Sequence, residues 1–351
     1  MIHDAGRLLA VGFDGTRIPD ALASQAERSG LGGIVLFARN CPTADTVLSL
    51  TAASRRLDPE LLVLVDHEGG RVHRLPEPFT RFPPAAAVGR LGEPRLVAAV
   101  ATAMALELRA AGFDSGLAPV LDCRLDPANT VIGDRAFGSE PDAVAAIGTA
   151  FVEAMLPTGL VPVAKHFPGH GLTSVDSHHA LPDTAATLDD LERGELVPFR
   201  AVLAAGCPAV MVAHVRYRAL DAELPGSLSP RIVSDLLRRH LGFDGFVLSD
   251  DLEMAAVAST WGVADAARRF LVAGGDLALI CRSEEARGRA LATIEREIER
   301  GALDPAPAAR RRRAIRGLIE AAGARPGLSV IGCAEHRALA EEIARRSAER
   351  D

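Results

Sequence analysis

Eight short, almost wholly apolar runs recur along this chain, separated by longer segments with helical spacing. Apolar residues spaced three and four apart in 94–112 and 191–206 predict amphipathic helices between the runs. Strands that are nearly all apolar and alternate with helices are typical of a parallel sheet covered by helices. The runs are RLLAVGF (7–13), GGIVLFA (32–38), LLVLVD (61–66), SGLAPVLD (115–122), LVPVAKHF (160–167), AVMVAH (209–214), GFVLSDD (245–251) and DLALIC (276–281).

Eight units of this kind predict an α/β fold of the (β/α)8 TIM-barrel class. The chain has 351 residues, more than the roughly 250 typical of such barrels, so we expect long loops and a C-terminal helical extension. A doubly wound open sheet is the alternative, but no GxGxxG motif follows the first run. The segment ARPGLS (324–329) is the one plausible boundary, which predicts a single catalytic domain over 1–325 and the extension over 326–351.

Composition and charge argue against several classes of protein. The formal net charge of −7 disfavours a nucleic-acid-binding surface, and the arginines at 310–313 are predicted to form a solvated helix face. The five cysteines are widely spaced with no CxxC pair, as expected for reduced thiols. The N-terminus does not resemble a signal peptide, and no run of about eighteen apolar residues could span a membrane. We expect a soluble, cytoplasmic protein with no membrane or nucleic-acid partner.

Polar residues stand at the carboxyl ends of the predicted strands, where TIM barrels carry their active sites. Adjacent residues of a strand point to opposite sides, so only one of Asp250 and Asp251 can face the barrel mouth. The sequence alone leaves open which one does. The strand-end residues are Asp66, Asp122, Lys165, His166, His214, Asp250 and Asp251.

The stretch KHFPGHGLTSVDSHH (165–179) holds four of the ten histidines. A metal site is one interpretation, through His166, His170, His178, His179 and Asp176, but no HExxH-type spacing is present. A phosphate cradle at FPGHG is a second, but no GxxxxGK[ST] loop opens a helix there. The third is proton transfer by His178 with Asp176 as its orienting neighbour, and the residues favour this one.

In these motifs the chain closely resembles the glycoside hydrolase family 3 β-N-acetylhexosaminidases, specifically the bacterial cell-wall-recycling enzymes. The resemblance covers roughly residues 5–320 and includes VLVDHEGGRVHRL, LAPVLD, VIGDRAFGSE, KHFPGHGLTSVDSHHALP, VMVAHVRY and GFVLSDDLEM in that order. It implies a glycosidase that needs neither a metal nor another cofactor.

The resemblance also implies roles for individual residues. Asp250 would be the nucleophile, His178 the acid/base and Asp176 its orienting partner, while Asp251 would be structural. A retaining glycosidase needs a nucleophile and a proton donor on opposite sides of the glycosidic bond. An imidazole with a pKa near 6.5 can protonate the leaving oxygen and then deprotonate water. The sugar contacts would fall on Asp66, Arg74, Arg135, Lys165, His166 and His214.

The function implied is that of an exo-β-N-acetylglucosaminidase acting on peptidoglycan fragments such as GlcNAc-anhydromuropeptides, or on chito-oligosaccharides, as a monomer or weak dimer. A β-N-acetylglucosaminide phosphorylase or another family 3 β-glycosidase is the alternative, because a histidine does not repel phosphate as a carboxylate would. A catalytically silent muropeptide sensor is the alternative outside the enzymes. The intact Asp250 and His178 argue against that sensor, because binding alone requires neither a nucleophile nor a proton shuttle.

Overall fold

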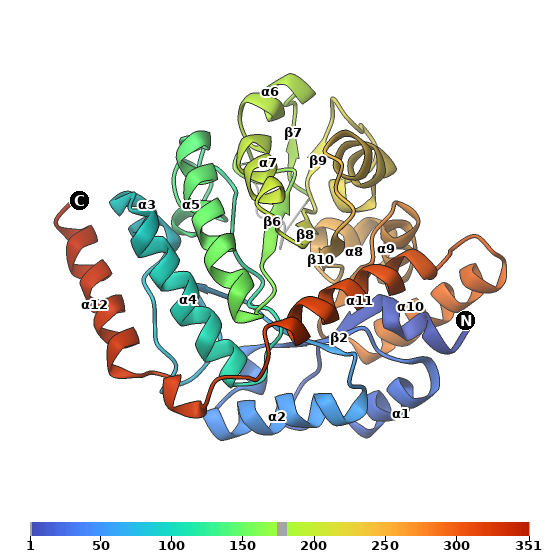
Figure 1. The fold of residues 1–351 in the computed structure, drawn as a ribbon. Coiled ribbons are helices and arrows are strands. Elements are labelled where there is room, and N and C mark those ends of the chain that lie inside the picture. The colour runs from blue at the N-terminus through green and yellow to red at the C-terminus, as the bar shows by residue number, and fades with distance from the viewer. Residues whose placement is uncertain (1, 174–180, 351) are drawn as a thin grey trace.

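The computed structural model describes residues 2–173 and 181–350, and Figure 1 shows its helices and strands. Its parallel strands form a ring. Within these ranges seven strands pair in the order β3-β2-β1-β11-β10-β8-β6. The segment 115–120 holds the eighth position, because Ser115 pairs with Leu64 of β3 and Val120 with Lys165 of β6. The ring confirms the predicted (β/α)8 barrel. Its strands are β1 (Leu9–Val11), β2 (Gly33–Leu36), β3 (Leu62–Val65), β6 (Val163–Phe167), β8 (Ala209–Val212), β10 (Phe246–Asp251) and β11 (Leu277–Ile280).

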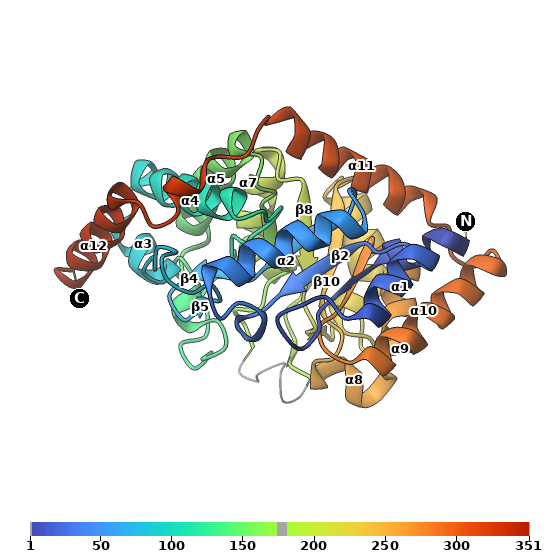
Figure 2. The same ribbon diagram turned by 90° about the horizontal axis from the view of Figure 1, so that it is seen from below.

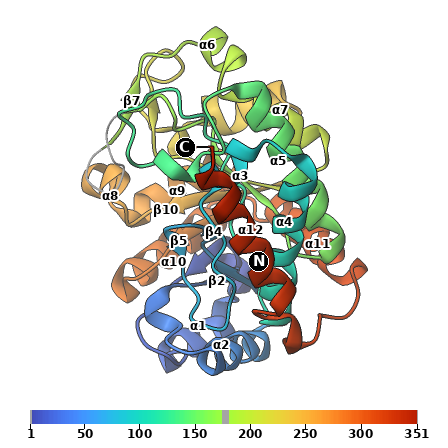
Figure 3. The ribbon, with the colours of Figure 1, turned by 90° about the vertical axis from the view of Figure 1, so that its left-hand side faces the viewer.

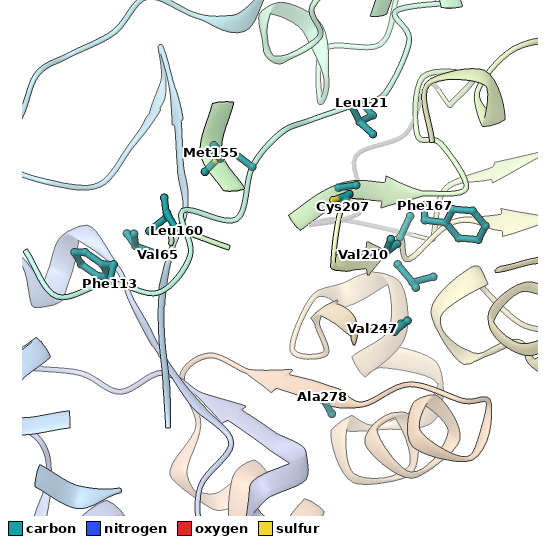
Figure 4. Close-up of a cluster of buried hydrophobic side chains, with 14 of the residues drawn as sticks. Val65, Phe113, Leu121, Met155, Leu160, Phe167, Cys207, Val210, Val247 and Ala278 are labelled. Atoms are coloured by element: carbon teal, nitrogen blue, oxygen red, sulfur yellow. The ribbon is translucent and has the colours of Figure 1, made fainter. Parts of the chain in front are cut away.

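Alternation along the strands separates two apolar cores. Leu62, Leu64 and Leu248 belong to the core inside the barrel, whereas Val63 and Val247 belong to the core between the barrel and its helices. Figure 4 shows part of this outer core around Val247. Residues two positions apart share a face of a strand. The register that buries Leu64 and Leu248 inside therefore turns the next inward-facing residues of β3 and β10 toward the barrel mouth.

Helices cover the outside of the ring (Figures 1 and 3). The helix predicted over 94–112 is α4 (Pro94–Ala110), but the one predicted over 191–206 is interrupted. There α6 (Leu188–Arg193) ends at Gly194, whose backbone is not helical (φ −124°, ψ −100°), and α7 (Leu196–Ala204) follows. The remaining helices around the barrel are α1 (Asp20–Ser29), α2 (Ala44–Leu57), α3 (Ala85–Leu91), α5 (Pro141–Met155), η6 (Arg231–His240), α8 (Ala255–Trp261), α9 (Val263–Val272) and α10 (Glu284–Glu299).

Helix α11 (Ala306–Ala321) closes the amino-terminal end of the barrel, where Ile315 and Ile319 join the inner core. The prediction that the arginines at 310–313 form a solvated face is wrong for two of them. Arg311 is bound to Asp276 at 3.0 Å, and Arg312 is only 3% exposed. The reason is that α11 lies against the barrel. Successive residues point in different directions around the helix axis, so some of these arginines face the protein and others face solvent.

Helix α12 (Ala334–Ala348) lies against α3 and α4 at the edge of the molecule (Figures 1 and 3). His336 Nδ1 is 2.8 Å from Glu107 Oε1, and Arg346 pairs with Glu93. These contacts attach the extension to the barrel, while its boundary at 325/326 stays a prediction. None of the helices within residues 2–173 and 181–350 is long and apolar enough to cross a membrane.

Candidate active site

A cavity of about 140 Å³ opens at the carboxyl ends of the barrel strands. Six of the predicted site residues line it, whereas Asp176 and His178 lie outside the described residues. Larger hollows exist elsewhere on the protein, but this one gathers the charged strand ends. We call it the polar cavity, and its ionisable lining residues are Asp66, Glu68, Arg71, Arg74, Arg135, Lys165, His166, His170 and Asp250.

Asp250, rather than Asp251, faces the polar cavity. Leu248 lies in the inner core, and the register of β10 against β11 shifts between Leu248 and Asp251, so the lining of the cavity rather than simple alternation places Asp250 there. The carboxylate of Asp251 instead accepts hydrogen bonds from the backbone N–H groups of Glu253 (3.1 Å) and Cys281 (3.3 Å). The geometry thus answers the question that the sequence left open.

The two neighbouring carboxyl groups have opposite pKa shifts. Burial alone would raise the pKa of Asp250, but His166, His214, the N–H of Asp251 and Lys165 outweigh it and lower the pKa to about 2. Burial raises the pKa of Asp251 to about 7, with the charges of Glu253 and Asp250 adding to the effect. At neutral pH Asp250 is therefore fully ionised, which is the state that a carboxylate nucleophile requires.

A network of two acidic and two basic side chains forms one wall of the cavity. Lys165, which is 2% exposed, has Nζ 3.0 Å from Asp66 Oδ1 and 2.6 Å from Glu68 Oε1. Glu68 also accepts two hydrogen bonds from Arg135, at 2.7 and 2.8 Å. Burial would raise the pKa of Glu68, but Arg135 and Lys165 hold it well below its ordinary value. A bidentate Arg pair of this kind fixes both partners in position.

Glu68 was not among the predicted site residues. It lies on the short strand β4 (His67–Gly69), which forms a hairpin with β5 (Val72–His73). Gly69, at the end of β4, and Gly70, the first residue of the turn, have positive φ angles of 90° and 54°. A Cβ on Gly70 would lie 2.7 Å from Pro84 Cβ, so the close approach also requires glycine. The spacing of Asp66 and Glu68, two residues apart, was the available signal that both share one face.

His166 is held from two sides in the polar cavity. Its Nδ1 is 2.7 Å from Asp122 Oδ2, and its Nε2 is 3.3 Å from Arg135 Nη2. Burial would raise the pKa of the fully buried Asp122, but His166 and His170 lower it. Asp122 thereby supports His166 from behind, as a buried carboxylate fixes the orientation of an imidazole.

Arg74 and His214 differ in what they offer to a ligand. Arg74 lines the cavity, and its Nε has no hydrogen-bond partner among the described residues. His214 is 1% exposed, and both its ring nitrogens are engaged, Nδ1 with Ser227 Oγ (2.7 Å) and Nε2 with the backbone oxygen of Asp251 (3.0 Å). We expect Arg74 to bind the substrate directly and His214 to position the Asp250 segment instead of contacting sugar.

Comparison with known proteins identifies the family. Residues 3–316 match the model of the glycosyl hydrolase family 3 N-terminal domain. The chain belongs to this family. It is 43% identical over 267 residues to the β-hexosaminidase of Methylococcus capsulatus, covering 75% of this chain and 79% of that protein. The protein is accordingly a glycoside hydrolase of the β-N-acetylhexosaminidase type, which acts on a carbohydrate substrate.

Two solved structures agree with this assignment. A family 3 β-N-acetylglucosaminidase from Paenibacillus superposes with a TM-score of 0.93 at 35% identity, over 99% of this chain and 68% of that one. NagZ from Neisseria gonorrhoeae, solved with N-trifluoroacetyl-D-glucosamine, superposes with a TM-score of 0.79 at 32% identity, over 97% of this chain and 98% of that one. NagZ has also been solved in complex with zinc ion.

Besides Asp122, a second buried carboxyl group holds the first part of the 165–179 stretch of this family 3 hydrolase, at Gly171. Glu195, which is fully buried, accepts hydrogen bonds from the N–H groups of Gly171 (2.6 Å) and Cys123 (3.0 Å). A Cβ on Gly171 would lie 1.6 Å from the backbone oxygen of Cys123. Burial and the charge of Asp122 raise the pKa of Glu195 to about 8. No pattern in the sequence connects Glu195 to this loop.

These contacts speak against the phosphate interpretation of FPGHG. The backbone N–H of His170 donates to Asp122 Oδ1 at 2.7 Å, and the backbone N–H of Gly171 donates to Glu195. These two backbone donors are therefore not available to bind a phosphate. In the described part of the chain, no group of three His, Cys, Asp or Glu side chains could hold a metal ion. His178, His179 and Asp176 lie outside that part.

His67, beside the cavity wall, gives an acid-stability prediction. It is 2% exposed, its Nδ1 has no hydrogen-bond partner among the described residues, and its ring lies 4.5 Å from that of His73. Burial, aided by His73, lowers the pKa of His67 to about 3. Between the unfolded value of about 6.5 and pH 3, the unfolded chain binds a proton that the folded chain does not, so stability falls as pH falls.

We expect His67→Gln to reduce the acid loss of unfolding free energy by up to about 1.4 kcal/mol per pH unit between pH 6 and 4. Urea unfolding at several pH values measures this slope. His240→Gln, at a surface histidine paired with Glu192, serves as the control and should not make the slope shallower. Identical slopes for wild type and His67→Gln would show that His67 is not the acid-sensitive group.

Proposed function

We propose that this protein is a retaining exo-β-N-acetylglucosaminidase with Asp250 as its nucleophile. The ionised Asp250 carboxylate, which lies in a cavity lined by Lys165, Arg135 and His166, is the main support for this proposal. The cavity volume of about 140 Å³ is small beside the roughly 300 Å³ at the lower end of drug-sized pockets. It suits one terminal sugar residue, and hence exo cleavage.

The chemistry proceeds in two displacements. An oxygen of Asp250 attacks the anomeric carbon, the glycosidic C–O bond breaks, and His178 gives its proton to the leaving oxygen. A water molecule then loses a proton to His178 and attacks the same carbon, which frees Asp250. Asp176 favours the protonated imidazole and fixes its orientation. Two inversions at one carbon give net retention.

The network around Lys165 supplies the specificity in this scheme. The sugar hydroxyl groups are contacted by Lys165, Arg135, Arg74 and His166. Asp66 accepts hydrogen bonds from the sugar hydroxyl groups. An analogue that lacks one hydroxyl leaves a buried charged group without its partner, which is a strong basis for discrimination. Glu68 lies behind them and, together with Asp66, offsets the charges of Lys165 and Arg135.

We infer that the substrates are GlcNAc-containing peptidoglycan fragments, such as GlcNAc-anhydromuropeptides, or chito-oligosaccharides. NagZ bound to N-trifluoroacetyl-D-glucosamine supports an N-acylated sugar at the non-reducing end. A cytoplasmic location and a monomer or weak dimer belong to the same proposal. All five cysteines are free, which fits a reducing compartment.

The experiment that tests the function compares aryl glycosides of N-acetyl-β-glucosamine, N-acetyl-β-galactosamine and β-glucose. We expect turnover of the first, with kcat/KM well above that for glucose, and free N-acetylglucosamine as product. Saturable binding without product would support the silent sensor. N-acetylglucosamine 1-phosphate formed in phosphate buffer would support the phosphorylase, because a neutral imidazole base does not repel an anionic acceptor as a carboxylate would.

Metal removal separates the proposed His178/Asp176 pair from a metal site on the same stretch. We expect unchanged kcat/KM in excess EDTA, because no step above passes through a metal. The same comparison with and without EDTA can be made on NagZ, a relative that has been solved in complex with zinc ion. Activity lost in EDTA and restored by zinc would overturn the proton-transfer pair in favour of a metal site.

A further inference from the structure

A second cavity, of about 220 Å³, lies between the N-terminal segment η1 (Ile2–Leu8) and the first half of α11. Figures 1 and 2 show the start of α11 near the N-terminus of the chain. Its apolar lining is Leu8, Pro305 and Ala309, and its charged lining is Asp4, Arg7, Glu60, Arg312 and Arg313. We call it the basal cavity. Its α11 wall lies at the amino-terminal end of the barrel, opposite the carboxyl ends that open into the polar cavity.

Arg312 is the unexplained group in the basal cavity. It is 3% exposed, and its Nε is buried without a hydrogen-bond partner. Its guanidinium makes no hydrogen bond or ion pair with any residue in 2–173 or 181–350. Burial, with the charge of Arg7 adding to it, outweighs the opposing charges of Asp58, Glu60 and Asp276 and lowers the pKa of Arg312 to about 10, which leaves it charged at neutral pH. A buried charge without a partner is strongly unfavourable.

The carboxylates of the basal cavity are already engaged by another arginine. Arg7 has Nε 3.1 Å from Asp4 Oδ1, Nη2 2.9 Å from Asp58 Oδ2 and Nη1 2.9 Å from Glu60 Oε2. Arg7 is thus shared among three carboxylates, while the lining of the basal cavity itself holds three arginines against two acidic side chains, a net charge of +1. Arg312 and Arg313, which are adjacent on α11 and both line the cavity, remain without ion-pair partners in the described part of the chain.

We propose that the basal cavity binds a small oxyanion of the phosphate or carboxylate class through the guanidinium groups of Arg312 and Arg313. The planar guanidinium matches two oxygens of such an anion at once. The volume of about 220 Å³ leaves room for a small oxyanion. Because Ile315 and Ile319 of the same helix fill the base of the barrel, an anion that offsets the buried charge of Arg312 would stabilise the position of α11 at this end.

Calorimetric titration with inorganic phosphate, and separately with acetate, against chloride at constant ionic strength tests this site. We expect saturable binding to wild type and at least about tenfold weaker binding to Arg312→Gln. Arg310→Gln is the matched control, because Arg310 lies on the same helix but is largely exposed and does not line the cavity. It should bind the anion as wild type does. Whichever of phosphate and acetate binds tighter identifies the class of the ligand.

Thermal unfolding gives a second readout on the same proteins. The melting temperature of wild type should rise with the binding anion, and that of Arg312→Gln should not. If Arg312→Gln does not fold, Arg313→Gln takes its place and should weaken binding severalfold. Absence of saturable binding of both anions, or binding that Arg312→Gln leaves unchanged, would overturn the proposal. Glycosidase activity is not the readout, so the result is independent of the proposed function.

Discussion

Replacing Asp250 by Ala is expected to lower kcat by at least about 10⁴-fold on every leaving group, because the first displacement loses its nucleophile. Steady-state rates on an aryl N-acetyl-β-glucosaminide and on a disaccharide measure the loss. The substitution removes a carboxylate that lines the polar cavity and accepts a hydrogen bond from the N–H of Asp251 at 2.8 Å.

Asp251→Asn is the matched control for this substitution. It keeps an acceptor for the N–H groups of Glu253 and Cys281, and the side chain faces away from the polar cavity. We expect its activity to stay within about tenfold of wild type. Azide should restore part of the turnover of Asp250→Ala as a glycosyl azide, because a small anion can enter the space that the carboxylate leaves. Loss of activity in Asp251→Asn equal to that in Asp250→Ala would remove the distinction between the two.

His178→Ala is expected to slow the natural disaccharide about 10²- to 10⁴-fold while leaving the first step with a nitrophenyl glycoside much less affected. The reason lies in the leaving group, since a nitrophenolate departs without a proton whereas a sugar alkoxide does not. The second step still lacks its base, so a burst of nitrophenol should appear in pre-steady-state measurements.

Asp176→Ala should give a weaker form of the same pattern, because in the proposed mechanism this carboxylate only orients and charges the imidazole. Its pH profile for kcat/KM should also shift to lower pH, since the imidazolium loses a stabilising charge. Equal losses for His178→Ala on both leaving groups would show that His178 is not the proton donor.

The barrel could be predicted because its strands carry a local signal. Each of the eight apolar runs is long enough to stand out, and each corresponds to one position of the ring, including the segment 115–120 that joins it through two isolated bridges. The strand-end positions of Asp66, Lys165 and Asp250 follow from the same pattern. The interruption of the helix at Gly194 could not be predicted with the same ease, because the apolar spacing continues across it.

The choice between Asp250 and Asp251 required the structure. Both faces of β10 are apolar, so the sequence does not say whether Leu248 faces the inside of the barrel or the helices. The register of β10 also shifts between Leu248 and Asp251, so only the structure shows that Asp250 lines the polar cavity. The same lack of contrast affects every strand that is buried on both sides.

The spacing from Asp66 was a local signal for Glu68, but the pairings of the supporting carboxyl groups could not be predicted, because their partners are distant along the chain. Glu68 meets Arg135 and Lys165, and Glu195 meets Cys123 and Gly171, only after the barrel has formed. Burial of Arg312 depends in the same way on how α11 lies against the barrel. Local spacing carries information about elements, whereas pairing between elements depends on topology.

Mapping the covalent intermediate would test directly whether Asp250 is the nucleophile. The protein would be incubated with a slow fluorinated N-acetylglucosaminide, quenched at low pH, digested with pepsin and analysed by tandem mass spectrometry. We predict one sugar per chain, bound as an ester to Asp250. A label on Asp251 or Asp176, or no label under conditions where turnover is measured, would contradict it.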